Sequence, residues 1–140
     1  MINIYIAAFK EFGDYALLKK VCDYFLSRQN KENVNFFVSV GESGDNTCMK
    51  HVRDNGYSYT DWLPIKQGKN RAKEKLKFIK ESDHCILVHD GYSRGIDIAL
   101  KYAVNNVKGK VVVIYPYINE INVWNKNSDK PIIKKIYETK

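Results

Sequence analysis

Five runs rich in β-branched and aromatic residues alternate with helix-like segments along most of this chain, at residues 1–8, 36–40, 57–62, 85–88 and 111–115. Between these runs, apolar residues recur at the spacing of a helix face. After Asp14, a residue type that caps helices, Leu17, Leu18, Val21 and Phe25 show this spacing. Strict alternation of strands and helices predicts an α/β fold, with a parallel sheet of about five strands and helices on both faces.

The remaining residues, 116–140, do not continue the alternation. Residues 116–129 are polar and predict a connector. Ile132, Ile133, Ile136 and Tyr137 then form an apolar stripe, which favours a short terminal helix. We therefore divide the chain into a domain at 1–115 and a tail at 116–140, whose helix packs on the same domain or on a dimer partner.

Composition narrows the classes of partner. The chain has 140 residues, a net charge of +7 and a pI near 9.2, which favours an anionic partner. It has no apolar run of membrane-spanning length, and it does not begin like a signal peptide, so we expect a cytoplasmic protein with no membrane partner. The three cysteines have no metal-like spacing and predict reduced, buried thiols and no metal site.

Three turns that contain glycine follow predicted strands, at residues 41–46, 68–71 and 90–95. The carboxyl ends of parallel strands lie at one edge of a sheet, where helix amino termini supply N–H groups that favour phosphate. Arg71 and Lys73 add positive charge to the first turn of a helix. We expect ligand contacts at Gly41, Glu42, Ser43, Gly44, Gly68, Arg71, Lys73, Asp90, Gly91, Ser93, Arg94 and Gly95.

The last of these turns belongs to the most specific pattern in the chain. Ser82-Asp83, an apolar strand and Asp90-Gly91-Tyr92-Ser93-Arg94-Gly95 together resemble the pattern of the YspA-like branch of the SLOG superfamily, a branch found in bacteria and phages. Asp61-Trp62 with residues 68–74, and residues 12–15, are similar to two further segments of that family. The resemblance covers residues 2–115 and implies the Rossmann-like, three-layer fold of the related LOG and DprA proteins.

The resemblance also implies a ligand. Where the family ends its first strand in Gly-Ser-Arg, this chain has Ala8-Phe9-Lys10, which implies ligand contacts at Ala8 and Lys10. The turn at 41–46 carries Glu42 and Asp45 and lacks the family's basic residue, so the ligand or its pose differs. We expect a homodimer that binds a nucleotide-derived small molecule of the NAD, ADP-ribose or signalling-nucleotide class, for sensing or sequestration. The sequence assigns no cofactor beyond this nucleotide ligand.

Two other functions stay open. In a LOG-like N-glycosidic hydrolase or transferase, Asp90 or Glu42 would face the sugar and Arg71 or Arg94 would hold phosphate. The Pro-Gly-Gly-x-Gly-Thr turn of that branch is absent here, so we favour binding without catalysis. In DprA-like binding of single-stranded nucleic acid, the basic run at 69–80 would contact the strand, although its alternation spreads the charge around a helix.

The turn itself has alternative interpretations. Asp90 and Arg94 could form an ion pair or brace the loop instead of contacting a ligand. His89 could act as an acid or base, or it could be a packed residue at the end of a strand.

Overall fold

The computed structural model describes residues 1–39, 43–61, 69–126 and 128–137, with only the backbone described at 43 and 69–72. The strands are β1 (Ile2–Ala8), β2 (Val34–Val38), β3 (Ser58–Asp61), β4 (His84–Val88), β5 (Val111–Tyr115), β6 (Glu120–Trp124) and β7 (Ile132–Lys135). The helices are α1 (Tyr15–Leu26), α2 (Ser43–Asp54), α3 (Lys69–Lys80) and α4 (Arg94–Asn106), with 3-10 turns η1 (Lys31–Asn33) and η2 (Pro116–Ile118).

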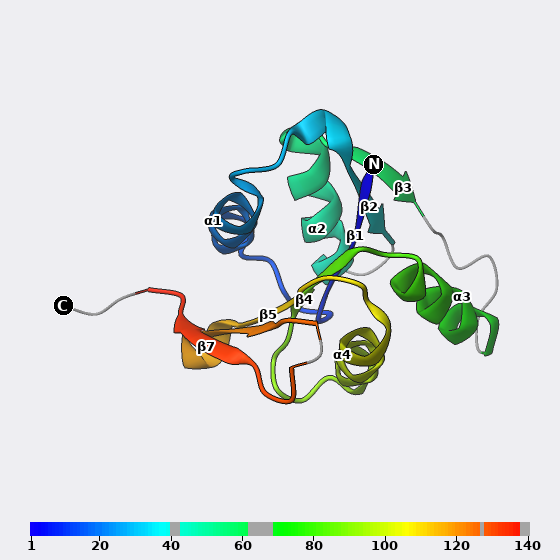
Figure 1. Cartoon of the computed structure of the whole chain (residues 1–140). Coiled ribbons are helices and arrows are strands. Elements are labelled where there is room, and N and C mark those ends of the chain that lie inside the picture. Colours follow the sequence, from blue (N-terminus) through cyan, green and yellow to red (C-terminus); the bar gives the residue numbers. More distant parts are fainter. Residues whose placement is uncertain (40–42, 62–68, 127, 138–140) are drawn as a thin grey trace.

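All seven strands form one mixed sheet in the order β3-β2-β1-β4-β5-β6-β7. The first five are parallel, as the alternation predicted, and β6 and β7 are antiparallel. The central strands β1 and β4 are buried along almost their whole length, because helices cover both of their faces. Figure 1 shows α1 and α2 on one side of the sheet, and α3 and α4 on the other.

The prediction of about five strands, all parallel, is wrong in number and direction. The sheet has two more strands, β6 and β7, and both lie in the tail. The predicted connector contains η2 and β6, joined by Asn119 in the left-handed conformation (φ 56°). Along β6, Ile121 and Val123 are buried, which is the two-residue period of a half-buried strand. The predicted terminal helix is instead β7, and its β-branched isoleucines suit a strand better than a helix.

Local signals explain how the elements begin and how the core is filled. The Asp14 carboxylate accepts a hydrogen bond from Leu17 N–H (3.1 Å), which confirms the predicted cap of α1. Cys22, Cys48 and Cys85 are free and buried, as predicted, and burial raises the pKa of each thiol.

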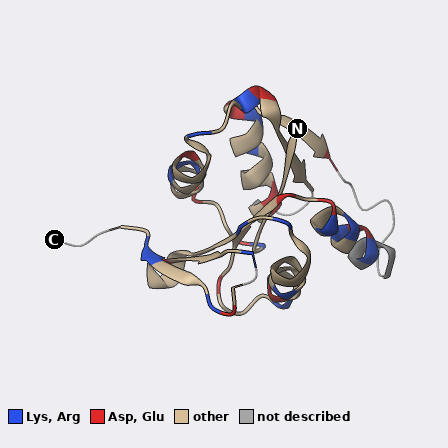
Figure 2. Ribbon diagram, viewed as in Figure 1, with Lys and Arg blue, Asp and Glu red and all other residues tan. Residues whose placement is uncertain are grey.

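Two further properties of the surface bear on partners. Figure 2 shows that basic residues are concentrated along α3. Within the described ranges, no helix is both long enough and apolar enough to cross a membrane.

Candidate functional site

The carboxyl ends of β1 and β4 lie next to each other in the middle of the sheet. Ala8 is the register partner of Val88, and Phe9 N–H donates to the Val88 carbonyl (3.0 Å). After β1 the chain continues toward β2, and after β4 it continues toward β5, on opposite sides of this pair. Ligands of α/β proteins bind where the strand order reverses in this way. We call residues 9–14 and 89–93 the switch-point loops.

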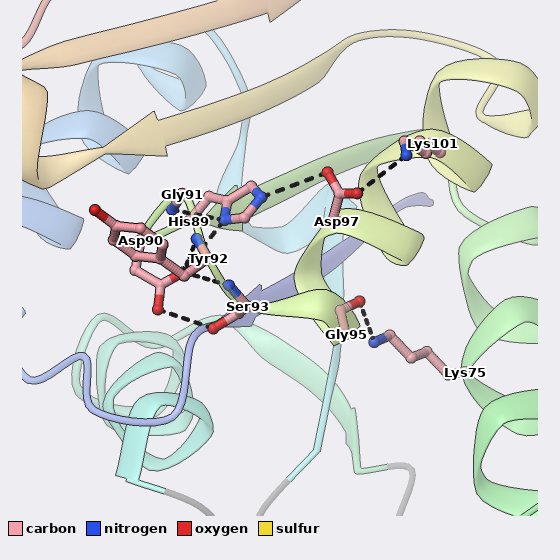
Figure 3. Close-up of polar contacts among 9 residues, drawn as sticks. All are labelled: Lys75, His89, Asp90, Gly91, Tyr92, Ser93, Gly95, Asp97 and Lys101. Carbon is pink, nitrogen blue, oxygen red and sulfur yellow. Dashed lines mark hydrogen bonds and ion pairs between the residues drawn. The ribbon is translucent and has the colours of Figure 1, made fainter.

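Asp90 holds the second switch-point loop in shape. Its Oδ1 accepts hydrogen bonds from Tyr92 N–H (2.9 Å) and Ser93 N–H (2.7 Å), and its Oδ2 accepts one from the Ser93 hydroxyl (2.9 Å) (Figure 3). Partial burial opposes ionisation, but these hydrogen bonds outweigh it and hold the pKa of Asp90 below its ordinary value. Asp90 is therefore the loop brace that the sequence left as one alternative, and its partners are the loop's own backbone and Ser93 rather than Arg94.

His89 also holds this loop, from its buried side. The ring is buried and stacks on Tyr115, with centroids 5.4 Å apart. Its Nδ1 accepts a hydrogen bond from Gly91 N–H (3.0 Å), so a neutral ring carries its hydrogen on Nε2. That nitrogen faces the Asp97 carboxylate at 3.7 Å, and Lys101 contacts the same carboxylate at 3.1 Å (Figure 3). The hydrogen bond from Lys101 lowers the pKa of Asp97. His89 is thus packed at the end of a strand.

The first switch-point loop is fixed by the start of α2. Gly44 N–H donates to the Lys10 carbonyl (2.9 Å), and the Thr47 hydroxyl donates to the Phe12 carbonyl (3.0 Å). A side chain at Gly44 would overlap the Phe9 carbonyl oxygen, so only glycine allows this approach. One N–H at the amino end of α2 is therefore already used by the loop.

The outward-facing groups of the site come from α4 and from two tyrosines. Ser93 is the N-cap of α4 but makes no side-chain cap, because its hydroxyl bonds to Asp90. Arg94 is exposed and forms no ion pair with any other described residue. Tyr92 is 89% exposed, and Tyr117, which follows β5, is 70% exposed. Tyr117 lies 5.7 Å from the Phe9 ring, which places it beside the first switch-point loop.

The structure brings together part of the predicted set. Asp90, Gly91 and Ser93 lie in one loop, and Arg94 and Gly95 begin α4 directly after it; Ala8 is buried at the end of the adjacent strand, and the Lys10 side chain is exposed. Lys73 is exposed on α3, whereas Lys75 reaches the site: its Nζ donates to the Gly95 carbonyl at 2.8 Å. Gly41, Glu42, Gly68 and the side chains of Ser43 and Arg71 lie outside the described residues.

Sequence reasoning missed two contributors. Tyr117 lay in the predicted connector, although an aromatic residue just after a parallel strand is a usable signal for a stacking position. Lys75 was seen only as part of a basic run, and its contact with α4 depends on how the two helices pack. In the ranges that the structure describes, no three His, Cys, Asp or Glu side chains are grouped so that they could hold a metal ion.

The arrangement suits binding of an anion that carries a flat ring. An uncapped helix amino terminus and a guanidinium favour phosphate, and exposed tyrosine faces favour a base. Comparison with models of protein families and with curated proteins finds no match to this chain.

Proposed function

We propose that this protein is a Rossmann-like member of the SLOG type that binds a nucleotide-derived ligand of the NAD, ADP-ribose or signalling-nucleotide class at the switch-point loops. The observation that carries the proposal is that, within residues 89–95, some side chains hold the loop in shape and others face solvent. Asp90 and His89 are used to hold the loop, while Arg94 forms no ion pair with another described residue and α4 has no side-chain cap at its amino end, at the reversal of strand order. Preformed sites of this kind bind with little cost of reorganisation.

In the proposed complex, a phosphate group lies at the first turn of α4. The N–H groups of that turn donate to its oxygens, and the Arg94 guanidinium approaches from the side. The base stacks on Tyr92 or Tyr117, both of which are exposed in the free protein. Lys75 donates a hydrogen bond to the Gly95 carbonyl and adds positive charge close to the phosphate.

Sensing or sequestration is favoured over turnover by the state of Asp90. Both of its oxygens accept hydrogen bonds inside the loop, and its pKa is lowered, so it is a poor proton donor to a leaving base. It is also turned toward its own backbone, whereas a glycosidase carboxylate must face the sugar. We therefore infer that Asp90 shapes the site rather than acting on a substrate.

Isothermal titration calorimetry with NAD, ADP-ribose, AMP and adenosine tests the proposal. Arg94→Ala removes a charge-assisted hydrogen bond to phosphate, so we expect affinity for the phosphorylated ligands to fall by about tenfold or more. Binding of adenosine, which has no phosphate, should not change. Arg28→Ala is the matched control, because Arg28 is exposed just beyond the carboxyl end of α1. Equal affinities for Arg94→Ala and the parent would place the site elsewhere.

The Asp90→Ala variant distinguishes a residue that shapes the loop from one that contacts the ligand. This variant should weaken binding and also speed hydrogen exchange at the Tyr92 and Ser93 amides, which lose their acceptor. Arg94→Ala should leave the exchange rates as they are. Release of free base or ribose phosphate from any ligand in the panel would contradict the assignment to sensing.

A further inference from the structure

A groove of about 640 Å³ lies between α1 and the β6–β7 hairpin, lined by residues of these elements and by none of the switch-point loops. Its floor is apolar and well packed: Val21 of α1, Ile121 of β6 and Ile136, which follows β7, are all buried. Figure 1 shows β7 at the end of the sheet, on the side of α1. The groove is therefore a built surface of the domain core and not a gap in a loop.

Three lysines surround this floor: Lys20 on α1, and Lys134 and Lys135 on β7. Lys20 Nζ lies 3.9 Å above the Tyr137 ring, and Lys134 Nζ lies 3.4 Å from the Tyr24 hydroxyl. These contacts position the ammonium groups of Lys20 and Lys134 without neutralising their charge. None of the three lysines forms an ion pair with another described residue, and no described acidic side chain lines the groove.

β7 also offers an open strand edge, because it is the last strand in the sheet. Ile136 N–H donates to the Asn119 carbonyl on the β6 side (3.2 Å). Because backbone groups alternate along a strand, those of Ile133 and Lys135 point to the outer edge. The strand is exposed throughout its length, including Ile132 (52%) and Ile133 (62%). Natural proteins cover or charge such edges, since an open edge pairs with other chains.

We propose that β7 and the groove bind an extended acidic peptide segment by strand addition. The peptide pairs with the outer edge of β7 through its backbone. On the side facing α1, its carboxylates meet Lys20 and Lys134; on the opposite face, its apolar side chains pack beside Ile133, because alternate residues of a strand point to opposite faces. A second copy of this chain is a poorer fit to the same edge. Pairing of β7 with β7 would gather the four lysines of the two strands at one edge, and like charges close together are destabilising.

Fluorescence anisotropy with a labelled peptide of alternating valine and glutamate tests this proposal. We expect saturable binding to the parent, and no binding of the same peptide with lysine in place of glutamate. Lys134→Glu with Lys135→Glu should weaken binding by about tenfold or more. The control combines Lys77→Glu with Lys80→Glu on α3. It changes the net charge by the same amount at a place far from the groove, and it should bind like the parent.

A third peptide makes the result independent of the variants. It keeps the glutamates but has proline at alternate positions, so it cannot complete a β ladder. If it binds as tightly as the first peptide, or if the α3 control loses as much affinity as the β7 variant, the proposal is wrong. Sedimentation gives another contradicting outcome: a dimer of the parent that the β7 variant dissociates would assign the edge to a second copy.

Discussion

The free energy of unfolding should fall as the pH is lowered from neutral, because His51 is buried as a neutral ring. His51 lies on α2 between Tyr15 and Tyr57 and has no exposed surface. Its Nδ1 is 3.2 Å from the Asn55 amide, and its Nε2 has no hydrogen-bond partner among the described residues. Burial is the main cause that lowers the pKa of His51 to about 4. A histidine in an unfolded chain has a pKa of about 6.5.

The sign and size follow from these two values. Between them the unfolded chain binds a proton that the folded protein does not, so stability rises with pH in this window. The loss of stability caused by His51 reaches its full size below pH 4, and it is absent above neutral pH. The expected loss relative to neutral pH is about 2 kcal/mol near pH 5 and about 3 kcal/mol near pH 4.

Urea denaturation followed by circular dichroism, at a series of pH values, measures this loss. The matched variant is His51→Phe, which keeps a ring between Tyr15 and Tyr57 but cannot be protonated. Asn55 retains its bonds to the His51 carbonyl position (2.8 Å) and the Tyr15 hydroxyl (3.1 Å). The difference in stability between parent and variant should shrink or change sign as the pH falls. A pH dependence that is the same in both proteins would refute the role given to His51.

Two further predictions concern the elements that position the site. Gly44→Ala should lower stability by about 2 kcal/mol, because the new methyl overlaps the Phe9 carbonyl oxygen; Gly13→Ala, whose methyl meets no atom within 4 Å, should not lower it, and equal thermal shifts would argue against the close contact. Asp14→Ala should cost about 1 kcal/mol by removing the cap of α1, while Asp23→Ala, which breaks an exposed ion pair on the same helix, should change the melting temperature little.

Much of the parallel part of the fold could be predicted from the sequence. Runs such as Cys85–Val88 are buried on both faces, so their apolar character is continuous and easy to detect. The tail could not be predicted in the same way. β6 has only two fully buried residues, and they alternate with Glu120, Asn122 and Trp124. A two-residue period that repeats so few times does not stand out in a polar segment. β7 is an exposed edge, so burial left no pattern on it.

The site shows the same division. The motif around Asp90 located the loop, because a polar, glycine-rich turn after a buried strand is a local signal. The role of Asp90 could not be predicted, since its carboxylate could equally have faced a ligand, Arg94 or its own backbone. Tyr117 and Lys75 enter the site through tertiary packing, which no local pattern encodes.

The most direct test of the central claim is a two-dimensional ¹H–¹⁵N NMR titration of the intact protein with ADP-ribose. The account predicts that the largest shifts fall on the amides of Gly91–Gly95 and of Phe9 and Lys10, with smaller shifts at Tyr117. Shifts confined to α1 and β7, or none at saturating ligand, would contradict nucleotide binding at the switch-point loops.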